Sequence, residues 1–370
     1  MKPAWGESYK LTTAMREISI TPQRALLRRY LAAGYALFIV YASLSPFTGW
    51  QKQGLEFSAV LVAPLWQTYT LFDAVVNLLA YLPFGLLLGL TLCVRFGAGW
   101  SVLLATLGGV ALSVAMEYAQ MYLPGRISSN LDLLSNSLGA LTGALLAVTI
   151  APRAWFVLHL AHWRLRLFHS RDGVDFGLAL VALWMFAQVT PSLPMLGNVF
   201  ISEVARPPFA VAQPEPFDWL ESMAVSLNLL MLGLLLLTLL RQRRHAAGAL
   251  LLVLCAVALA KFIAAAVLLK SWALFLWLNS EAMLGIFTGV LLLTAASRLP
   301  NARLLWLAAL VALAHLVLAQ GVLDSGAPSA SMRLYQWNYG HLLTYNGLSQ
   351  TIALAFPFLM LSYLWRLRNR

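Results

Sequence analysis

Charged residues are scarce in this sequence, and their scarcity excludes a water-soluble globular protein. Only 11% of the 370 residues are charged, whereas a soluble domain carries roughly 25%. Hydrophobic residues make up 61% of the chain. Apolar stretches recur along the whole length, and each is long enough to cross a bilayer core of about 30 Å. The short alternating segments of a β-barrel are not seen. The sequence therefore predicts an all-α, polytopic helical membrane protein.

Cysteines and acidic residues are also few. Cys93 and Cys255 both fall inside apolar stretches, which predicts two small core residues and not a disulfide or a metal site. Lys and Arg number 25 against 14 Asp and Glu, giving a net charge of +11. Because basic residues mark the cytoplasmic loops of membrane proteins, we expect no nucleic-acid partner. The common catalytic and nucleotide-binding motifs are absent as well.

Ten apolar spans can be drawn along the chain. They cover approximately residues 26–45, 71–92, 99–122, 131–151, 175–192, 219–240, 247–269, 277–297, 302–320 and 347–365. Nineteen Lys and Arg residues lie in the N-terminal segment, in every second loop and in the C-terminal tail, against five in the other loops. The positive-inside rule then predicts that both termini lie in the cytoplasm, and we expect a protein of the bacterial cytoplasmic (inner) membrane.

An internal repeat divides the first eight spans into two halves of four. Three short sequence motifs occur in both halves, in the same order and at a near-constant offset. One of them is Gly139-x3-Gly143, which recurs as Gly285-x3-Gly289. An even number of spans in each half makes the repeats parallel. We therefore predict a cytoplasmic segment (1–25), a four-helix domain (26–151), a basic cytoplasmic loop (152–174), a second four-helix half (175–297), and two appended helices with a basic tail (298–370).

Polar residues gather in three consecutive spans of the first half. The candidate site residues are Asp73 and Asn77 in the second span, Glu117 and Gln120 in the third, Arg126 in the loop that follows, and Asp132 and Asn136 in the fourth. Residues three or four apart share a helix face, and each pair lies near the predicted outer end of its span. Ionisable residues inside a membrane are costly and mark function by default. We therefore expect an outward-facing ligand site.

A purely structural interpretation of this set stays open. Buried polar residues also form hydrogen-bond networks that fix helix packing, and Arg126 could neutralise Glu117 or Asp132. However, three carboxylates against one guanidinium leave surplus acceptors. That surplus favours a missing cation, proton or amine-bearing ligand.

The spacing of these residues resembles the VanZ-like membrane family over about residues 30–150. The pattern runs Tyr41-Ala-Ser-Leu-Ser45-Pro46, Asp73-x3-Asn77-x5-Pro83-Phe84-Gly85, Glu117-x2-Gln120-x3-Pro124-Gly125-Arg126-x-Ser128, and Asp132-x3-Asn136-x2-Gly139-x3-Gly143. The resemblance implies a small helical bundle in the cell envelope. It also implies a link to glycopeptide resistance, since the family's named member contributes to low-level teicoplanin resistance. It implies no particular reaction.

The second half is a degenerate match to the same pattern. Ala224 stands in place of Asp73, and Leu278 and Ala282 stand in place of the acid and amide of the fourth span. If the repeat is real, this half has kept its packing residues and lost the site.

Three functions are open at this point. The first, which we favour, is a non-enzymatic protein that binds or relocates a lipid-linked glycan or a phospholipid on the outer leaflet, with Arg126 on a phosphate. It needs no cofactor, and an envelope protein is a further candidate partner. The second is a membrane-embedded transferase or hydrolase, with Glu117 as general base and Asp73 with Asp132 on Mg²⁺. The third is an ion-coupled transporter.

One further charge lies inside a span. Lys261 is expected in the outer half of the seventh span, at a depth that Glu281 of the eighth could reach. A structural ion pair between the two is the default expectation, because a lone charge in a membrane is costly.

Overall fold

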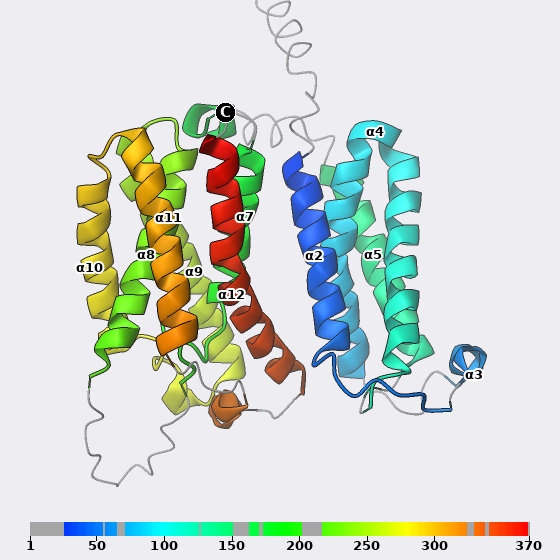
Figure 1. Cartoon of the computed structure of the whole chain (residues 1–370). Helices are drawn as coiled ribbons and strands as arrows, with labels where there is room; N and C mark the ends of the chain where they lie inside the picture. The colour runs from blue at the N-terminus through cyan, green and yellow to red at the C-terminus, as the bar shows by residue number, and fades with distance from the viewer. Residues whose placement is uncertain are drawn as a thin grey trace, which may run out of the picture. The chain divides into compact units, whose positions relative to one another are not determined.

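The chain is described by a computed structural model, and the described residues are almost all helical (Figure 1). They comprise residues 26–54, 56–64, 71–124, 126, 128–150, 163–169, 173–201, 217–323, 329–336 and 340–368. The predicted N-terminal segment and most of the predicted basic loop lie outside them. The chain divides into two compact units, Met1–Leu158 and His159–Arg370.

The helices follow the predicted spans closely. The first unit contains α2 (Leu26–Leu44), α3 (Phe57–Val62), α4 (Leu71–Gln120) and α5 (Asn130–Ile150). The second contains α7 (Val174–Gln188), α8 (Trp219–Leu239), α9 (Ala246–Leu268), α10 (Ser280–Ala296), α11 (Asn301–Val317) and α12 (Gly340–Arg368). Each predicted span coincides with one of these helices or, for the second and third spans, with part of α4.

Within the described ranges, six helical segments are long and apolar enough to cross a membrane. One of them, Asp73–Gln120, has 48 residues, or about 72 Å of helix, which is more than twice a bilayer core. The helices α2, α7 and α10 fall below the same limits of length or hydropathy. The all-α, multi-pass architecture is thus confirmed.

Helix α4 is folded back on itself at Gly97. This residue has φ 74° and ψ −179° inside an otherwise continuous helix, a conformation that glycine adopts far more readily than other residues. The break creates a first arm, residues 71–96, and a second arm, residues 98–120, which Figure 1 shows side by side and joined at one end. The predicted loop between the second and third spans is therefore a turn at a single residue.

Helix α5 packs directly onto the backbone of the first arm. A Cβ atom added to Gly139 would lie 2.2 Å from the carbonyl oxygen of Leu78, and one added to Gly143 would lie 2.0 Å from that of Leu82. Only glycine permits such an approach, as in other small-residue helix pairs of membranes. This contact holds the polar N-terminal end of α5 against the open end of α4.

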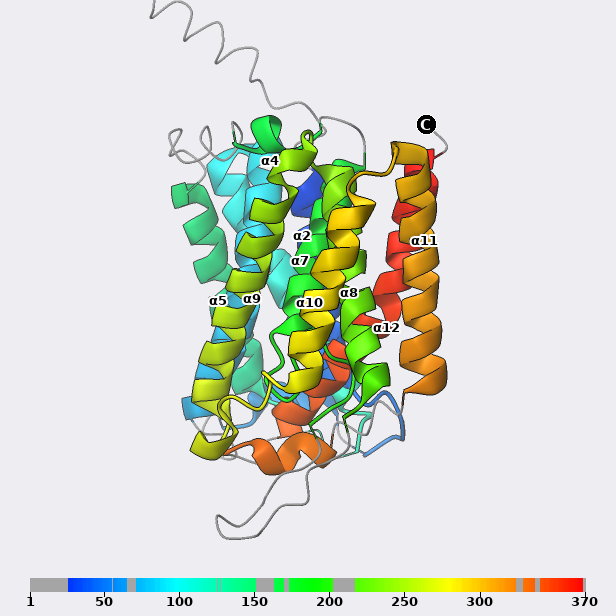
Figure 2. The same cartoon turned by 90° about the vertical axis from the view of Figure 1, so that its left-hand side faces the viewer.

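The second unit is built around α8, and 83% of its span is buried. Helix α10 packs against α8 through Gly285, where an added Cβ would lie 2.6 Å from the carbonyl oxygen of Ser222. Figure 2 shows these two helices beside each other. Both units thus contain a contact between a glycine and the backbone of a neighbouring helix. The predicted repeat would make α5 equivalent to α10, and the first arm of α4 equivalent to α8. The repeat itself stays a prediction.

Two expectations for the second unit are wrong. Cys255 is exposed on α9 and is not a core residue, while Cys93 of the first unit is half-buried. Lys261 is fully buried, and its Nζ does not pair with Glu281. It donates instead to the carbonyl oxygens of Gln188 at 2.9 Å and Thr190 at 2.7 Å. The ammonium group therefore meets the negative end of α7, where the helix dipole and unpaired carbonyls favour a cation.

Candidate functional site

The site lies at the end of the first unit opposite the Gly97 turn. The first arm of α4 supplies Asp73 and Asn77, the second arm supplies Glu117, and the first turns of α5 supply Asp132 and Asn136. The hairpin shape of α4 brings both of its ends together, and the short connection at residues 121–129 returns the chain to the same end. These five residues form what we call the polar cluster.

Two buried carboxyl groups form the centre of the polar cluster. Glu117 is 4% exposed and Asp132 is 8% exposed. The Oε2 atom of Glu117 accepts the backbone N–H of Ser129 at 2.9 Å, and Oδ1 of Asp132 accepts the side-chain amide of Asn77 at 2.6 Å. The two carboxyl groups lie close enough to repel each other, and Asp73 adds a further repulsion on Asp132.

No ion pair of Glu117 or Asp132 is seen in the part of the chain that the structure describes, where the one salt bridge joins Arg164 and Asp175 of the second unit. Taking a carboxylate out of water without a cation or further donors costs several kcal/mol. The cluster is therefore poorly balanced as a self-contained network, because it holds more acceptors than donors.

Two residues missed by the sequence analysis complete the cluster. The amide of Asn136 donates to the hydroxyl of Ser113 at 2.9 Å, and Ser113 is fully buried on the second arm. Tyr81 of the first arm is 4% exposed, and its hydroxyl lies beside that of Ser113. The Oδ1 atom of Asn136 has no hydrogen-bond partner. Tyr81 follows Asn77 by four residues and Ser113 precedes Glu117 by four, so the helix-face rule could have found both.

Gln120 and Arg126 lie beside the cluster and contact the C-terminal end of α2. The amide of Gln120 donates to the carbonyl oxygen of Ser43 at 3.1 Å, and Nη2 of Arg126 donates to those of Ala42 at 3.3 Å and Ser45 at 3.1 Å. A cation at a helix C-terminus is favourable for the same reason as at α7. These two residues therefore fix α2 against the cluster.

The segment after α2 packs over the same end. The backbone N–H of Gln51 donates to the carbonyl oxygen of Tyr122 at 2.8 Å, and the side chain of Gln53 donates to that of Leu123 at 2.8 Å. The Ser45-Pro46 turn of the sequence pattern thus leads into a loop that contacts the connection between α4 and α5.

A metal centre finds little support in this geometry. Among the residues that the structure covers, no three His, Cys, Asp or Glu side chains are grouped so as to hold a metal ion. Asp73 and Asp132 would supply two of the roughly six ligands that Mg²⁺ requires. The remaining ligands would have to come from substrate or water.

The residues that build this site also carry a family signature. Residues 16–151 match the family model described as VanZ/LLP1. Over this range the protein is similar to the VanZ-like family. The match contains α2 to α5 and every residue of the polar cluster, so the resemblance drawn from residues 30–150 is confirmed. It ends at residue 151, before α7. No curated protein and no solved structure matches the chain. We call the first compact unit the VanZ-like unit below.

Proposed function

We propose that the VanZ-like unit binds the headgroup of a membrane lipid, either a lipid-linked glycan or a phospholipid, at the polar cluster. The observation that carries this proposal is the burial of Glu117 and Asp132 with no ion pair in the described part of the chain. Sugar hydroxyls or a headgroup amine would supply the donors that the carboxyl groups lack.

An unpartnered atom gives independent support. The Oδ1 atom of Asn136 is buried without a hydrogen bond, and such an atom costs about 1–3 kcal/mol if nothing binds it. A ligand with several hydroxyl groups would satisfy it while it contacts the carboxyl groups. A lipid phosphate, where the ligand has one, would lie toward the positive charge of Arg126.

The proposal also places the cluster toward the outer leaflet of a bacterial cytoplasmic membrane. In the VanZ-like unit, Nη1 of Arg28 donates to the carbonyl oxygen of Leu90 at 3.0 Å, and Arg95 precedes the Gly97 turn by two residues. These basic side chains share the end opposite the cluster. The positive-inside rule assigns that end to the cytoplasm.

Native mass spectrometry of gently solubilised full-length protein tests the proposal. We expect the wild type to retain a defined lipid or lipid-linked sugar, and Glu117→Gln and Asp132→Asn to lose most of it. Glu281→Gln, which changes a half-buried acid of the second unit, is the matched control and should retain the ligand. Identical, ligand-free spectra for all four proteins would overturn the proposal and leave the cluster as a structural network.

Thermal unfolding of the same proteins separates lost binding from lost folding. Asn is isosteric with Asp and still accepts the Asn77 amide through Oδ1, while the repulsion from Asp73 and Glu117 disappears. We therefore expect ligand-free Asp132→Asn to unfold at the wild-type temperature or above, as is common when a functional site is neutralised. Turnover of the retained ligand would distinguish the transferase or hydrolase alternative from a carrier.

A further inference from the structure

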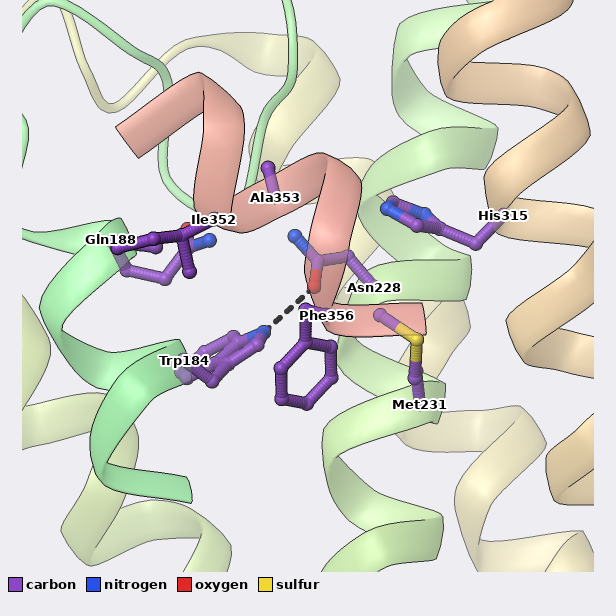
Figure 3. Close-up of a pocket in the computed structure, with 9 residues that line it drawn as sticks. Trp184, Gln188, Asn228, Met231, His315, Ile352, Ala353 and Phe356 are labelled. Carbon is purple, nitrogen blue, oxygen red and sulfur yellow. Dashed lines mark hydrogen bonds between the residues drawn. The ribbon is translucent and has the colours of Figure 1, made fainter. Parts of the chain in front are cut away.

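Two adjacent cavities lie inside the second unit, among α7, α8, α11 and α12. In the first cavity, the centre of a water molecule could occupy a volume of about 10 Å³. This cavity is lined by Trp184, Gln188, Asn228 and His315, with apolar side chains of α8 and α12 (Figure 3). The second, of about 20 Å³, shares Gln188 and two alanines with it. By this measure a cavity of roughly 10–15 Å³ holds one water. Each cavity therefore has room for water, and the shared residues make them neighbours.

The polar residues along the two cavities become progressively more buried. Gln320 is exposed, Asn198 and Gln350 are half-buried, and Gln188 and His315 are 6% and 2% exposed. The first three line the second cavity, Gln188 lines both, and His315 lines the first. Polar groups thus lead from the surface, near the loop that follows α7, to the buried imidazole.

Unpartnered polar atoms occur along the same path. Asn198 lines the second cavity and His315 lines the first. The Nδ2 atom of Asn198 and the Nδ1 atom of His315 are buried and have no hydrogen-bond partner. Glu221 adjoins the second cavity, because its Oε1 accepts the backbone N–H of Asn198 at 2.9 Å. Buried groups of this kind are normally satisfied by ordered water.

The backbone is also irregular at this depth. Pro357 has no N–H, so the carbonyl group of Ala353, which lines both cavities, has no helical donor. Beyond His315, α11 passes into a π-helical turn, Leu318–Val322, that contains Gln320. Irregular backbone at membrane depth is tolerated where it is buried in protein or lines a water-filled cavity, and π-helical turns are frequent at functional sites.

From this geometry we infer that the second unit contains a hydrated route from the loop end of α7 to His315, along which the imidazole exchanges protons with the aqueous phase. The ligand class is water and the proton that it carries. A hydronium ion in the route gives its proton to Nδ1, which forms an N–H bond and leaves a neutral water. The inference goes beyond the proposed lipid site, since no residue of the VanZ-like unit takes part.

His315 is well placed for this role. Its imidazole lines the first cavity and hydrogen-bonds to the backbone of Ala224, which fixes the ring. Asn228 is already held, because its Oδ1 accepts the indole N–H of Trp184 at 2.8 Å and its amide donates to the carbonyl oxygen of Leu196 at 2.9 Å. The other charged or titratable side chains on the elements packed around it include Asp175 on α7, Glu221 on α8, Lys261 on α9, Arg303 on α11, and Tyr345, Tyr363, Arg366 and Arg368 on α12.

Solid-state NMR of the full chain in lipid vesicles, with isotope-labelled histidine, tests the inference. Magnetisation transfer from water protons to the His315 ring reports hydration, and the signal is assigned by its loss in His315→Gln. We expect transfer in the wild type. In Gln188→Met it should fall about threefold or more, because a buried water needs two to four polar partners and this change removes one of them. The ring nitrogen signals of the wild type should also change protonation state on acidification.

Gln336→Met is the matched control. The amide of Gln336 donates to the carbonyl oxygen of Leu269 at 2.7 Å, and the residue lines neither cavity. Equal transfer in the wild type, Gln188→Met and Gln336→Met would overturn the route through Gln188. Absence of transfer in the wild type, or one neutral imidazole at every pH at which the protein stays folded, would overturn the whole inference. The wild-type measurement therefore tests the inference even if Gln188→Met does not fold.

Discussion

At the scale of single residues, the buried amine of Lys261 shows how this protein accommodates a charge without an acid. Its two hydrogen bonds satisfy carbonyl groups at the end of α7 that no helical N–H can reach. We expect Lys261→Met, which keeps the length and removes the donors, to lower the free energy of unfolding by about 2–4 kcal/mol.

Denaturation of the full chain in mixed detergent measures this change, with Lys270→Met as the control. Lys270 is exposed at the end of α9, and its replacement should have little effect. Equal losses for the two variants would show that the carbonyl contacts of Lys261 contribute nothing specific.

The candidate site was predictable where residues repeat on one helix face and unpredictable where helices far apart in sequence meet. Asn77 and Asp132 could be identified because each belongs to an acid and amide pair four residues apart, and such pairs are rare in apolar spans. Gln188 and His315 are single polar residues on different helices, so nothing local connects them. The partners of Lys261 are backbone carbonyl groups, and these carry no sequence signal at all.

At the scale of helices, the glycines of α5 set the distance to the first arm of α4. A Cβ at position 143 would also lie 2.6 Å from the backbone nitrogen of Leu86, and backbone cannot rotate aside as a side chain can. We expect Gly143→Ala to destabilise the protein by about 1–3 kcal/mol, the usual cost of overpacking.

Gly34→Ala should change the stability in the opposite direction. Gly34 lies within α2 and nothing lies within 4 Å of an added Cβ, so alanine should raise stability by about 0.5–1 kcal/mol through its better helix propensity. Melting temperatures of the two variants should therefore move in opposite directions. A fall of equal size in both would contradict the close contact between α4 and α5.

Hydropathy predicted most of the helices well because they are continuous apolar stretches, six of which, within the described ranges, are long enough to cross a bilayer core. It missed the form of the turn in α4, for which it predicted a loop at residues 93–98. Arg95 interrupts the apolar run, although the helix continues past it to the glycine. The six-residue helix α3 also escaped prediction, since it has no buried face and hence no periodic pattern.

At the scale of the whole molecule, most of the basic residues of each unit lie near one end of that unit. In the second unit, Nη1 of Arg243 donates to the carbonyl oxygen of Ser297 at 2.8 Å, and the guanidinium of Arg368 lies 4.5 Å from the ring centre of Trp306. The α8–α9 connection, the α10–α11 connection and the C-terminal end are therefore neighbours. Within the second unit, the alternation of basic loops seen in the sequence thus becomes one basic end.

Cysteine labelling tests the orientation that follows. In a Cys93→Ala, Cys255→Ala background, Ser58→Cys on exposed α3 should react with a membrane-impermeant maleimide in intact cells. Gln242→Cys, exposed beside Arg243, should react only after the cells are opened. The reverse pattern would place the polar cluster on the cytoplasmic side, and the cysteine-free chain should not be labelled in either condition.

The Gly97 turn has a consequence for how this chain enters its membrane. In the orientation proposed above the Gly97 turn faces the cytoplasm. Because one residue joins the two arms of α4, no loop could then remain on that side while the first arm inserts alone. We expect the arms to be delivered to the bilayer together as a helical hairpin, with the end that carries Asp73 and Glu117 leading. An acidic side chain at the centre of a bilayer costs roughly 2.5–3.5 kcal/mol on the insertion scale. The early apposition of the two arms, which lets these polar groups cross as a cluster, would lower that barrier during biosynthesis.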